Sequence, residues 1–402
     1  MPRILRIINR LNLGGPTLNV AYLSRFLAPE FDTMLVAGMI DETEESAAFI
    51  TDEMGLKPVY IPEMYREIHP LKDRLAYNRL KKLIRAYQPD IVHTHAAKAG
   101  TLGRLAAAAC DVPVIVHTFH GHVFHSYFPA WQTQMFIAIE RYLAKKSTRI
   151  ICISDKQKEE LTTAYRICPP EKAVVIPLGF DLQKFSSGLT EARKKFREYY
   201  LVAEDEIVIV IIGRLVPVKN HALFLRALQS VQGRTSKKIR AFIVGDGEER
   251  NAIEAKASSL QLDFTDFHSH PRSALLTFTS WIREVEEVYA GADIVALTSL
   301  NEGTPVSLIE AQAAGKPIVT TDAGGITDIV VPGKNALVTA TSDQQAFTEN
   351  LLLLIEDDLL RKKMTGYDSA AVTARFHYKR LMEEMATLYR LMLDEKSHRH
   401  RK

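Results

Sequence analysis

The sequence predicts an α/β protein built from two doubly wound parallel-sheet domains that face each other across a cleft. Strand-like and helix-like segments alternate along the whole chain. After a polar and charged stretch at 186–205, this alternation restarts with six apolar residues, Ile207–Ile212. A chain of 402 residues with 47% hydrophobic content can bury two separate cores. We therefore expect domains at 1–185 and 186–376.

Composition and charge exclude several classes of protein. The formal net charge of +3 is too small to indicate a nucleic-acid partner. The first eleven residues interleave charged and apolar side chains, as a strand does and a signal peptide does not. No apolar run approaches the ~18 residues of a membrane span. The three cysteines lack metal-ligand spacing and fit a reducing compartment. We expect a cytoplasmic protein, either free in solution or peripheral on the inner face of the membrane.

The elements of the N-terminal half follow from short apolar runs and from helical periodicity. Strands are expected at 3–10, 33–38, 58–61, 90–95, 112–118, 150–154 and 174–179. Helices are expected at 17–28, 71–87 and 131–146, with another beginning at Ser154-Asp155. The basic face of helix 71–87 is either a solvated surface or a contact with an anionic membrane.

Two glycines precede the first helix. Gly14 and Gly15 would let the backbone approach a phosphate closely, although a tight strand-to-helix turn explains them as well. The pattern is not Gly-x-Gly-x-x-Gly, so a dinucleotide site, and with it a nicotinamide dehydrogenase, is disfavoured.

Histidines gather after two of the expected strands. His93 and His95 alternate onto one strand face, and His120 and His122 could do the same. No carboxylate or cysteine accompanies them at ligand spacing, so we expect no metal. The region between Asp111 and Glu140 has no charged residue and is rich in aromatic side chains. It is a candidate acceptor pocket or lipid-facing edge.

In the C-terminal half, the strand Ile207–Ile212 delivers a glycine-led loop that carries Arg214 and Lys219. Ligands bind at the carboxyl ends of strands in open α/β sheets, and these two cations suit a diphosphate. A pair of solvated surface cations is the alternative. Further strands are expected at 241–244, 277–282, 293–297, 318–321 and 335–338. Further helices are expected at 221–232, 248–259, 285–290, 345–356 and 377–395. Residues 261–275 read as a loop or a short extra element.

The stretch Asn301–Val330 organises this half. Thr304 is expected to cap a helix of about three turns that begins at Pro305 and stops at Gly315. Glu302 then lies in the loop over the helix N-terminus, and Glu310 lies inside the helix. Capping and solvation are the alternative roles for the two carboxylates.

Taken together, these motifs resemble the retaining glycosyltransferases of family 4, which have the GT-B fold. The resemblance rests on Glu302-x7-Glu310, on the Gly-Arg-Leu-x-x-x-Lys segment from Gly213 to Lys219, on the glycine pair and on His120-Gly121. It implies that Arg214 and Lys219 hold the donor diphosphate, approached by Gly14 and Gly15, and that Glu310 takes the ribose hydroxyls. Glu302, the backbone of Gly303 and Thr304, and His120 would orient the donor sugar; His120 could instead be structural. Ile282 is a candidate for contact with the nucleotide base, although Ser280 stands where the family commonly has glycine.

The resemblance further implies transfer of a sugar from a nucleotide diphosphate sugar with retention, without a metal or other cofactor. The last helix, 377–395, would pack back on the N-terminal, acceptor-side domain. We favour a UDP-sugar donor and a glycan or polyprenyl-linked acceptor in cell-surface polysaccharide assembly. A sugar-nucleotide epimerase of GT-B architecture, a GDP-mannose-type transferase and a non-catalytic nucleotide-binding module remain alternatives.

Overall fold

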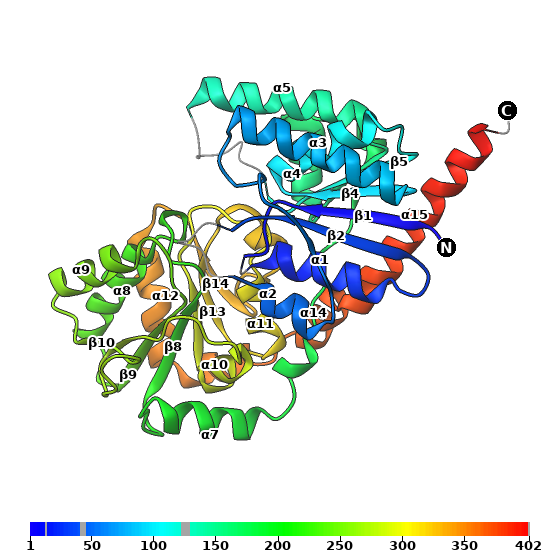
Figure 1. Cartoon of the computed structure of the whole chain (residues 1–402). Helices are drawn as coiled ribbons and strands as arrows, with labels where there is room; N and C mark the ends of the chain where they lie inside the picture. Colours follow the sequence, from blue (N-terminus) through cyan, green and yellow to red (C-terminus); the bar gives the residue numbers. More distant parts are fainter. Residues whose placement is uncertain (13, 41–45, 122–128, 401–402) are drawn as a thin grey trace. The chain divides into compact units, whose positions relative to one another are not determined.

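The computed structural model describes residues 1–12, 14–40, 46–121 and 129–400 (Figure 1). The chain divides into two compact units. Unit 1 comprises Met1–Phe180 together with Phe376–Lys402, and unit 2 comprises Asp181–Arg375. Each unit contains one sheet of seven parallel strands, so the predicted α/β class with two doubly wound parallel sheets is confirmed.

The sheet of unit 1 has the strand order β3-β2-β1-β4-β5-β6-β7. Its strands are β1 Arg3–Ile8, β2 Asp32–Gly38, β3 Val59–Ile61, β4 Ile91–His95, β5 Val114–Phe119, β6 Arg149–Cys152 and β7 Ala173–Val175. The order reverses between β1 and β4. Loops leaving two such strands diverge to opposite faces of the sheet, which leaves room for a ligand at their carboxyl ends.

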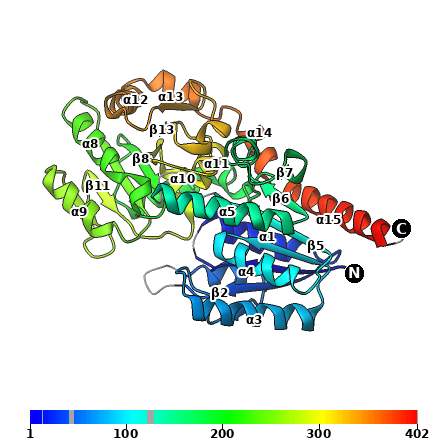
Figure 2. The same cartoon turned by 90° about the horizontal axis from the view of Figure 1, so that it is seen from above.

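Helices cover both faces of this sheet. They are α1 Gly15–Phe26, α2 Ala48–Glu53, α3 Pro70–Tyr87, α4 Ala97–Ala108, α5 Ala130–Lys146, α6 Asp155–Glu159 and α15 Tyr378–His400. Leu5 and Ile7 of β1 pack with α3 and α4, whereas Ile4 packs with α1 and α15 on the other face. In Figure 2, α3, α4 and α5 lie side by side.

The sheet of unit 2 has the order β10-β11-β9-β8-β12-β13-β14, with its reversal between β8 and β12. Its strands are β8 Ile207–Ile212, β9 Ile239–Val244, β10 Phe264–Asp266, β11 Leu276–Phe278, β12 Ile294–Leu297, β13 Ile318–Thr321 and β14 Ala336–Thr339. Its helices are α7 Leu189–Tyr199, α8 His221–Gln232, α9 Arg250–Ser259, α10 Val285–Gly291, α11 Val306–Ala313, α12 Gln344–Glu356, α13 Asp358–Met364 and α14 Ser369–Phe376, whose last residue is counted in unit 1.

Some elements differ from the sequence-based prediction. The strand expected at 277–282 ends at Phe278, because Ser280 has a left-handed backbone (φ 56°) that cannot continue a strand. The unassigned stretch 261–275 contributes the edge strand β10. Helices α2, α4, α13 and α14 were not predicted. Among the residues that the structure describes, no helix is both long enough and apolar enough to cross a bilayer.

Candidate functional site

The topology of unit 2 brings two distant loops together. β8 and β12 are parallel neighbours, with Val210 paired to Val295, so both strands end at the same edge of the sheet. The loop after β8 carries Arg214 and Lys219, and the loop after β12 carries Glu302. The two loops are bonded through their backbones: the amide of Leu300 donates to the carbonyl of Val218 at 2.8 Å. The motifs singled out from the sequence therefore meet at the point where the strand order reverses.

Lys219 and Glu302 form an ion pair at this edge. Lys219 Nζ lies 2.6 Å from Glu302 Oε1, and the two side chains are 18% and 12% exposed. The hydroxyl of Ser299 donates to the same carboxylate oxygen at 2.6 Å. Thr298 Oγ1 donates to the carbonyl of Lys219 at 2.9 Å and fixes the backbone that carries the lysine. The site thus holds an oriented ammonium group with further N–H donors beyond the one directed at Glu302.

The backbone of Glu302 also packs against a second glycine pair, Gly324-Gly325. The amide of Gly325 donates to the carbonyl of Glu302 at 2.9 Å. A Cβ atom on Gly324, whose φ is 57°, would lie 2.0 Å from that carbonyl oxygen. Because no side chain fits at this distance, glycine is required for the two backbones to approach.

The loop that carries Arg214 is supported in a similar way. Arg214 follows Gly213 at the end of β8 and is partly buried. A Cβ atom on Gly245 would lie 2.1 Å from the carbonyl oxygen of Gly213. The amide of Leu215 donates to the carbonyl of Asp246 at 2.9 Å. The Gly245-Asp246-Gly247 turn before α9 therefore packs against the backbone of the Arg214 loop and supports it.

Glu310 lies inside α11, as predicted, but the start of this helix was predicted wrongly. The helix runs from Val306 to Ala313 with Pro305, not Thr304, at the N-cap, because Pro305 keeps an extended backbone (ψ 111°). The hydroxyl of Tyr289 lies 3.0 Å from Glu310 Oε2 and 2.9 Å from the carbonyl of Ser307. Burial raises the pKa of Glu310 to about 7, and the hydrogen bond from Tyr289 opposes this shift.

Ser280 adopts the backbone conformation that glycine would favour. Its φ is 56°, its carbonyl accepts from the amide of Gly245, and its hydroxyl donates to Asp246 Oδ2 at 2.9 Å. Ser280 therefore adopts the left-handed turn conformation that glycine favours, and its hydroxyl adds a hydrogen bond to Asp246. Ile282, the candidate for base contact, follows in the same loop and is partly buried.

The candidate residues of unit 1 lie at the start of α1 and at the end of β5. Gly14 is the N-cap of α1, and Gly15 is its first residue. His120 directly follows β5, and its Nε2 lies 2.9 Å from Nδ1 of His95. Within the described part of the chain no group of three or more His, Cys, Asp or Glu side chains could hold a metal ion. His122, considered with this group, lies outside the described residues.

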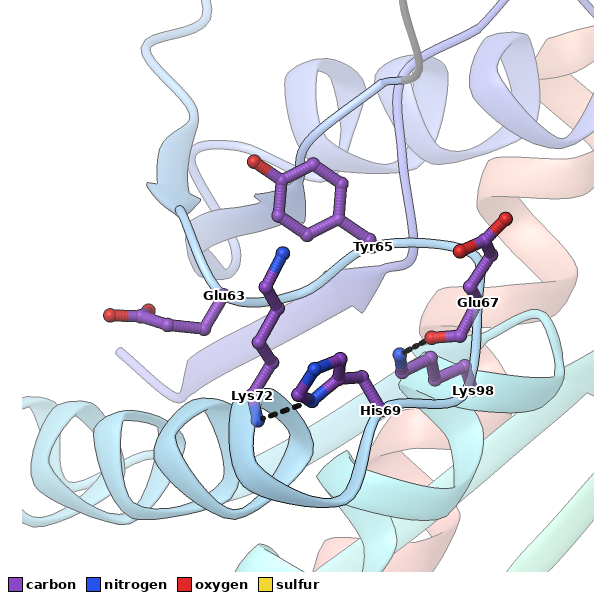
Figure 3. Close-up of a pocket in the computed structure, with 6 residues that line it drawn as sticks. All are labelled: Glu63, Tyr65, Glu67, His69, Lys72 and Lys98. Carbon is purple, nitrogen blue, oxygen red and sulfur yellow. Dashed lines mark hydrogen bonds between the residues drawn. The ribbon is translucent and has the colours of Figure 1, made fainter.

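A small surface pocket in unit 1 contains none of these residues (Figure 3). It is lined by Glu63, Tyr65, Glu67, His69, Lys72 and Lys98. Lys72 Nζ lies 4.6 Å from the centre of the Tyr65 ring, and Lys98 Nζ pairs with Asp73 at 2.6 Å and also donates to the carbonyl of Glu67. Both cations are thus engaged by the protein itself, and the pocket is not assigned to the site.

Two sequence profiles match the chain in succession. Residues 13–184 match the profile described as Glycosyltransferase Family 4, and residues 192–369 match that of Glycosyl transferases group 1. The chain belongs to glycosyltransferase family 4. It is 29% identical over 336 residues to the UDP-Gal:alpha-D-GlcNAc-diphosphoundecaprenol alpha-1,3-galactosyltransferase of Escherichia coli. The aligned region covers 83% of this chain and 84% of that enzyme.

Solved structures agree with this assignment at the level of the fold. The family 4 chain superposes on the sucrose-phosphate synthase of Thermosynechococcus elongatus with a TM-score of 0.79 and 18% identity, over 98% of this chain and 100% of that one. It superposes on the Anabaena protein HepE in complex with UDP-glucose with a TM-score of 0.78 and 20% identity, over 96% and 99%. The predicted GT-B fold is confirmed.

Three supporting residues of this glycosyltransferase were missed by sequence reasoning: Ser299, Tyr289 and Gly324. The Gly324-Gly325 pair was a usable signal, since adjacent glycines after a strand indicate close backbone approach. Ser299 and Tyr289 carry no such signal, because their roles depend on which strands become neighbours.

Replacing Gly324 by alanine tests the support behind Glu302. The new Cβ would displace the Glu302 carbonyl, so we expect the transferase kcat/KM of Gly324→Ala to fall about tenfold or more. Gly333→Ala is the matched control, since Gly333 also has a positive φ (73°) but would meet nothing within 4 Å. Both variants carry the backbone cost of about 1 kcal/mol, so equal activities would contradict the proposed support.

Proposed function

We propose that the protein is a retaining glycosyltransferase that moves a sugar from a nucleotide diphosphate sugar, with a UDP-sugar favoured, to a glycan or polyprenyl-linked acceptor in cell-surface polysaccharide assembly. The observation that carries the proposal is the Lys219–Glu302 pair at the carboxyl ends of β8 and β12. The activity for which the Escherichia coli relative is named supports the donor and acceptor classes. In this proposal unit 2 binds the donor and unit 1 serves the acceptor.

The chemistry requires stabilisation of the leaving group. As the bond between the sugar and the diphosphate breaks, negative charge develops on the phosphate oxygens and the sugar becomes oxocarbenium-like. Lys219 supplies a point charge and Arg214 a planar fork of donors, both from the loop after β8. We propose that no metal is needed, because two side-chain cations and backbone N–H groups meet this charge.

The carboxylates would orient the donor. Glu302, held by Lys219 and Ser299, keeps lone pairs for hydroxyl groups of the sugar, next to the backbone of Gly303 and Thr304. Glu310 would accept hydrogen bonds from the ribose hydroxyls. Gly14 and Gly15 would approach the diphosphate, Ile282 would contact the base, and His120 would contact the sugar.

Mass spectrometry of the purified protein with a panel of UDP- and GDP-sugars tests the function. With a polyprenyl-linked sugar acceptor present, we expect one donor to release its nucleotide diphosphate in an acceptor-dependent reaction. Turnover of a GDP-sugar would replace the uridine assignment, and isomerisation without acceptor would establish an epimerase instead. Retention is read from the anomeric configuration of the product.

Removing either cation in the same assay should abolish most of the transfer. We expect Arg214→Ala and Lys219→Ala to lower kcat/KM by about a hundredfold to a thousandfold, or about 3–4 kcal/mol of transition-state stabilisation. Lys334→Ala, which removes an exposed lysine of unit 2 in the turn before β14, is the control. Near-normal turnover in both site variants would rule out the diphosphate assignment.

The pKa of Glu310 predicts a pH dependence of donor binding. A carboxyl with a pKa of about 7 is only about one-tenth ionised at pH 6 and about nine-tenths ionised at pH 8. Because the ionised form accepts two hydroxyl hydrogen bonds, the donor Kd should decrease severalfold from pH 6 to pH 8. His221, two residues after Lys219, does not titrate in this range, since burial lowers its pKa to about 4.

Calorimetric titration with the donor across this range measures the effect. Glu310→Gln stays neutral at every pH, so its donor Kd should be weak and independent of pH. A wild-type Kd that does not change between pH 6 and pH 8 would contradict the ribose role of Glu310.

We also propose that α5 docks unit 1 on an anionic membrane. Its outer face exposes Trp131, Met135, Ile139 and Tyr142, which are 67%, 42%, 36% and 54% exposed. Their spacing places them along one stripe of the helix. The single acidic residue of α5, Glu140, is buried and accepts two hydrogen bonds from Arg104 at 2.7 and 2.9 Å. The exposed face is therefore apolar and cationic, with Lys145 and Lys146 at its end, which matches the chemistry of anionic lipid headgroups.

Vesicle sedimentation tests this surface. The protein should bind phosphatidylcholine vesicles containing phosphatidylglycerol more tightly than pure phosphatidylcholine vesicles. Lys145→Gln and Lys146→Gln should each weaken binding about fivefold, since one cation contributes about 1 kcal/mol at an anionic surface. Trp131→Ser should weaken it as well. Leu359→Ser, at an 81% exposed position of α13, is the control; an equal loss in this control, or no preference for anionic vesicles, would contradict docking by α5.

A further inference from the structure

A row of polar side chains crosses the apolar interior of unit 1. It comprises Arg6 on β1, His93 and His95 on β4, and His120 at the end of β5. The register pairs Arg6 with His93, so these side chains share the face of the sheet that is covered by α15. Figure 1 shows α15 running beside β1. Arg6, His93 and His95 are fully buried.

Arg6 is a cation that no acidic side chain neutralises within the described residues. The two N–H groups of its Nη1 are shared among three acceptors: His93 Nδ1 at 2.9 Å, the hydroxyl of Tyr389 at 3.3 Å and His95 Nε2 at 3.4 Å. A guanidinium group can donate but cannot accept. Both histidines must therefore present a lone pair to Arg6.

This constraint fixes the protonation of His95. Its Nε2 accepts from Arg6, so the single ring proton of the neutral imidazole lies on Nδ1. Nδ1 of His95 is 2.9 Å from Nε2 of His120 and donates to it. The pKa of His95 is well below its usual value because of burial, the other histidines and Arg6, which agrees with a neutral ring.

The hydrogen bond from His95 also determines which nitrogen of His120 carries the proton. Because its Nε2 accepts from His95, its proton lies on Nδ1. That atom is buried and has no hydrogen-bond partner among the residues that the structure describes. Burial lowers the pKa of His120 to about 4, so the neutral form persists through the physiological range.

We propose that Arg6 and His95 are positioning residues that fix His120 as a neutral Nδ1–H donor for an oxygen of the bound donor sugar. The inference rests on the proposed function for its substrate. It assigns His120 the role of a hydrogen-bond donor and not of a general base, since its one lone pair is occupied by His95. The chain of donors starting at a cation also strengthens each successive N–H group as a donor.

Nitrogen NMR of the histidine side chains tests the tautomer without any substrate. In the wild-type protein at pH 7, His120 should appear as the Nδ1–H tautomer, and so should His95. An Nε2–H tautomer or an imidazolium ring at His120 would overturn the inference. In Arg6→Met the donor to His95 Nε2 is absent, so His95 and His120 should show mixed tautomers.

Kinetics of paired variants test whether His95 affects sugar transfer through its hydrogen bond to His120. His95→Leu cannot donate to His120, so kcat should fall about tenfold, whereas His95→Asn keeps an N–H group near the position of Nδ1 and should retain more activity. His117→Leu is the control: His117 is equally buried on β5 but bonds Thr94 Oγ1 on the opposite face of the sheet. It should leave kcat near the wild-type value, with melting temperatures checked for each variant.

A double-mutant cycle separates positioning from general damage. If His95 acts through His120, adding His95→Leu to His120→Ala should change kcat by less than about twofold. Additive losses would contradict the proposal that His95 positions His120. Wild-type kcat in His120→Ala would remove the histidine from the reaction. Failure of the wild-type protein to transfer any sugar would instead refute the proposed function, while the NMR result would still decide the tautomer. If His95→Leu does not fold, Arg6→Met takes its place in the cycle.

Discussion

Parallel pairing of β8 with β12 is the constraint on which the site of unit 2 depends. Lys219 and Glu302 are 83 residues apart in sequence and 2.6 Å apart in space. They meet because parallel neighbours end at the same edge of the sheet, and because the crossover helices on either side of the reversal leave that edge open. Any change that slid β12 along β8 would separate the cation from its carboxylate and leave both groups partly desolvated without the opposite charge.

Close backbone approach gives this pair its rigidity. The loops that carry Arg214 and Glu302 each lie against a glycine at which an added Cβ atom would clash with a carbonyl oxygen, at 2.1 Å for Gly245 and 2.0 Å for Gly324. Hydrogen bonds between backbones then hold positions that side chains alone would hold loosely. The glycines therefore act on the chemistry through the placement of Arg214 and Glu302.

The sequence predicted the two sheets and the placing of Arg214 and Lys219 after a strand, of Glu302 in a loop and of Glu310 in a helix, because apolar strands and helical periodicity are local signals. It did not predict the roles of Ser299 and Tyr289, which depend on strand order. It misplaced the start of α11, because Pro305 keeps an extended backbone and is the N-cap instead of the first helical residue. The length of β11 was also missed, because a serine gives no warning that its backbone is left-handed.

The two units orient polar groups by different physical means. In unit 2 opposite charges at a mostly buried edge attract each other, and solvent and a ligand can compete for them. In unit 1 the buried Arg6 has no counter-charge among the described residues, and its effect on His93 and His95 comes from the direction of its hydrogen bonds. A buried donor that cannot accept forces every successive ring to adopt one tautomer. Sequence inspection could place these histidines on one strand face, but only the contact with Arg6 shows which nitrogen of each ring carries the proton.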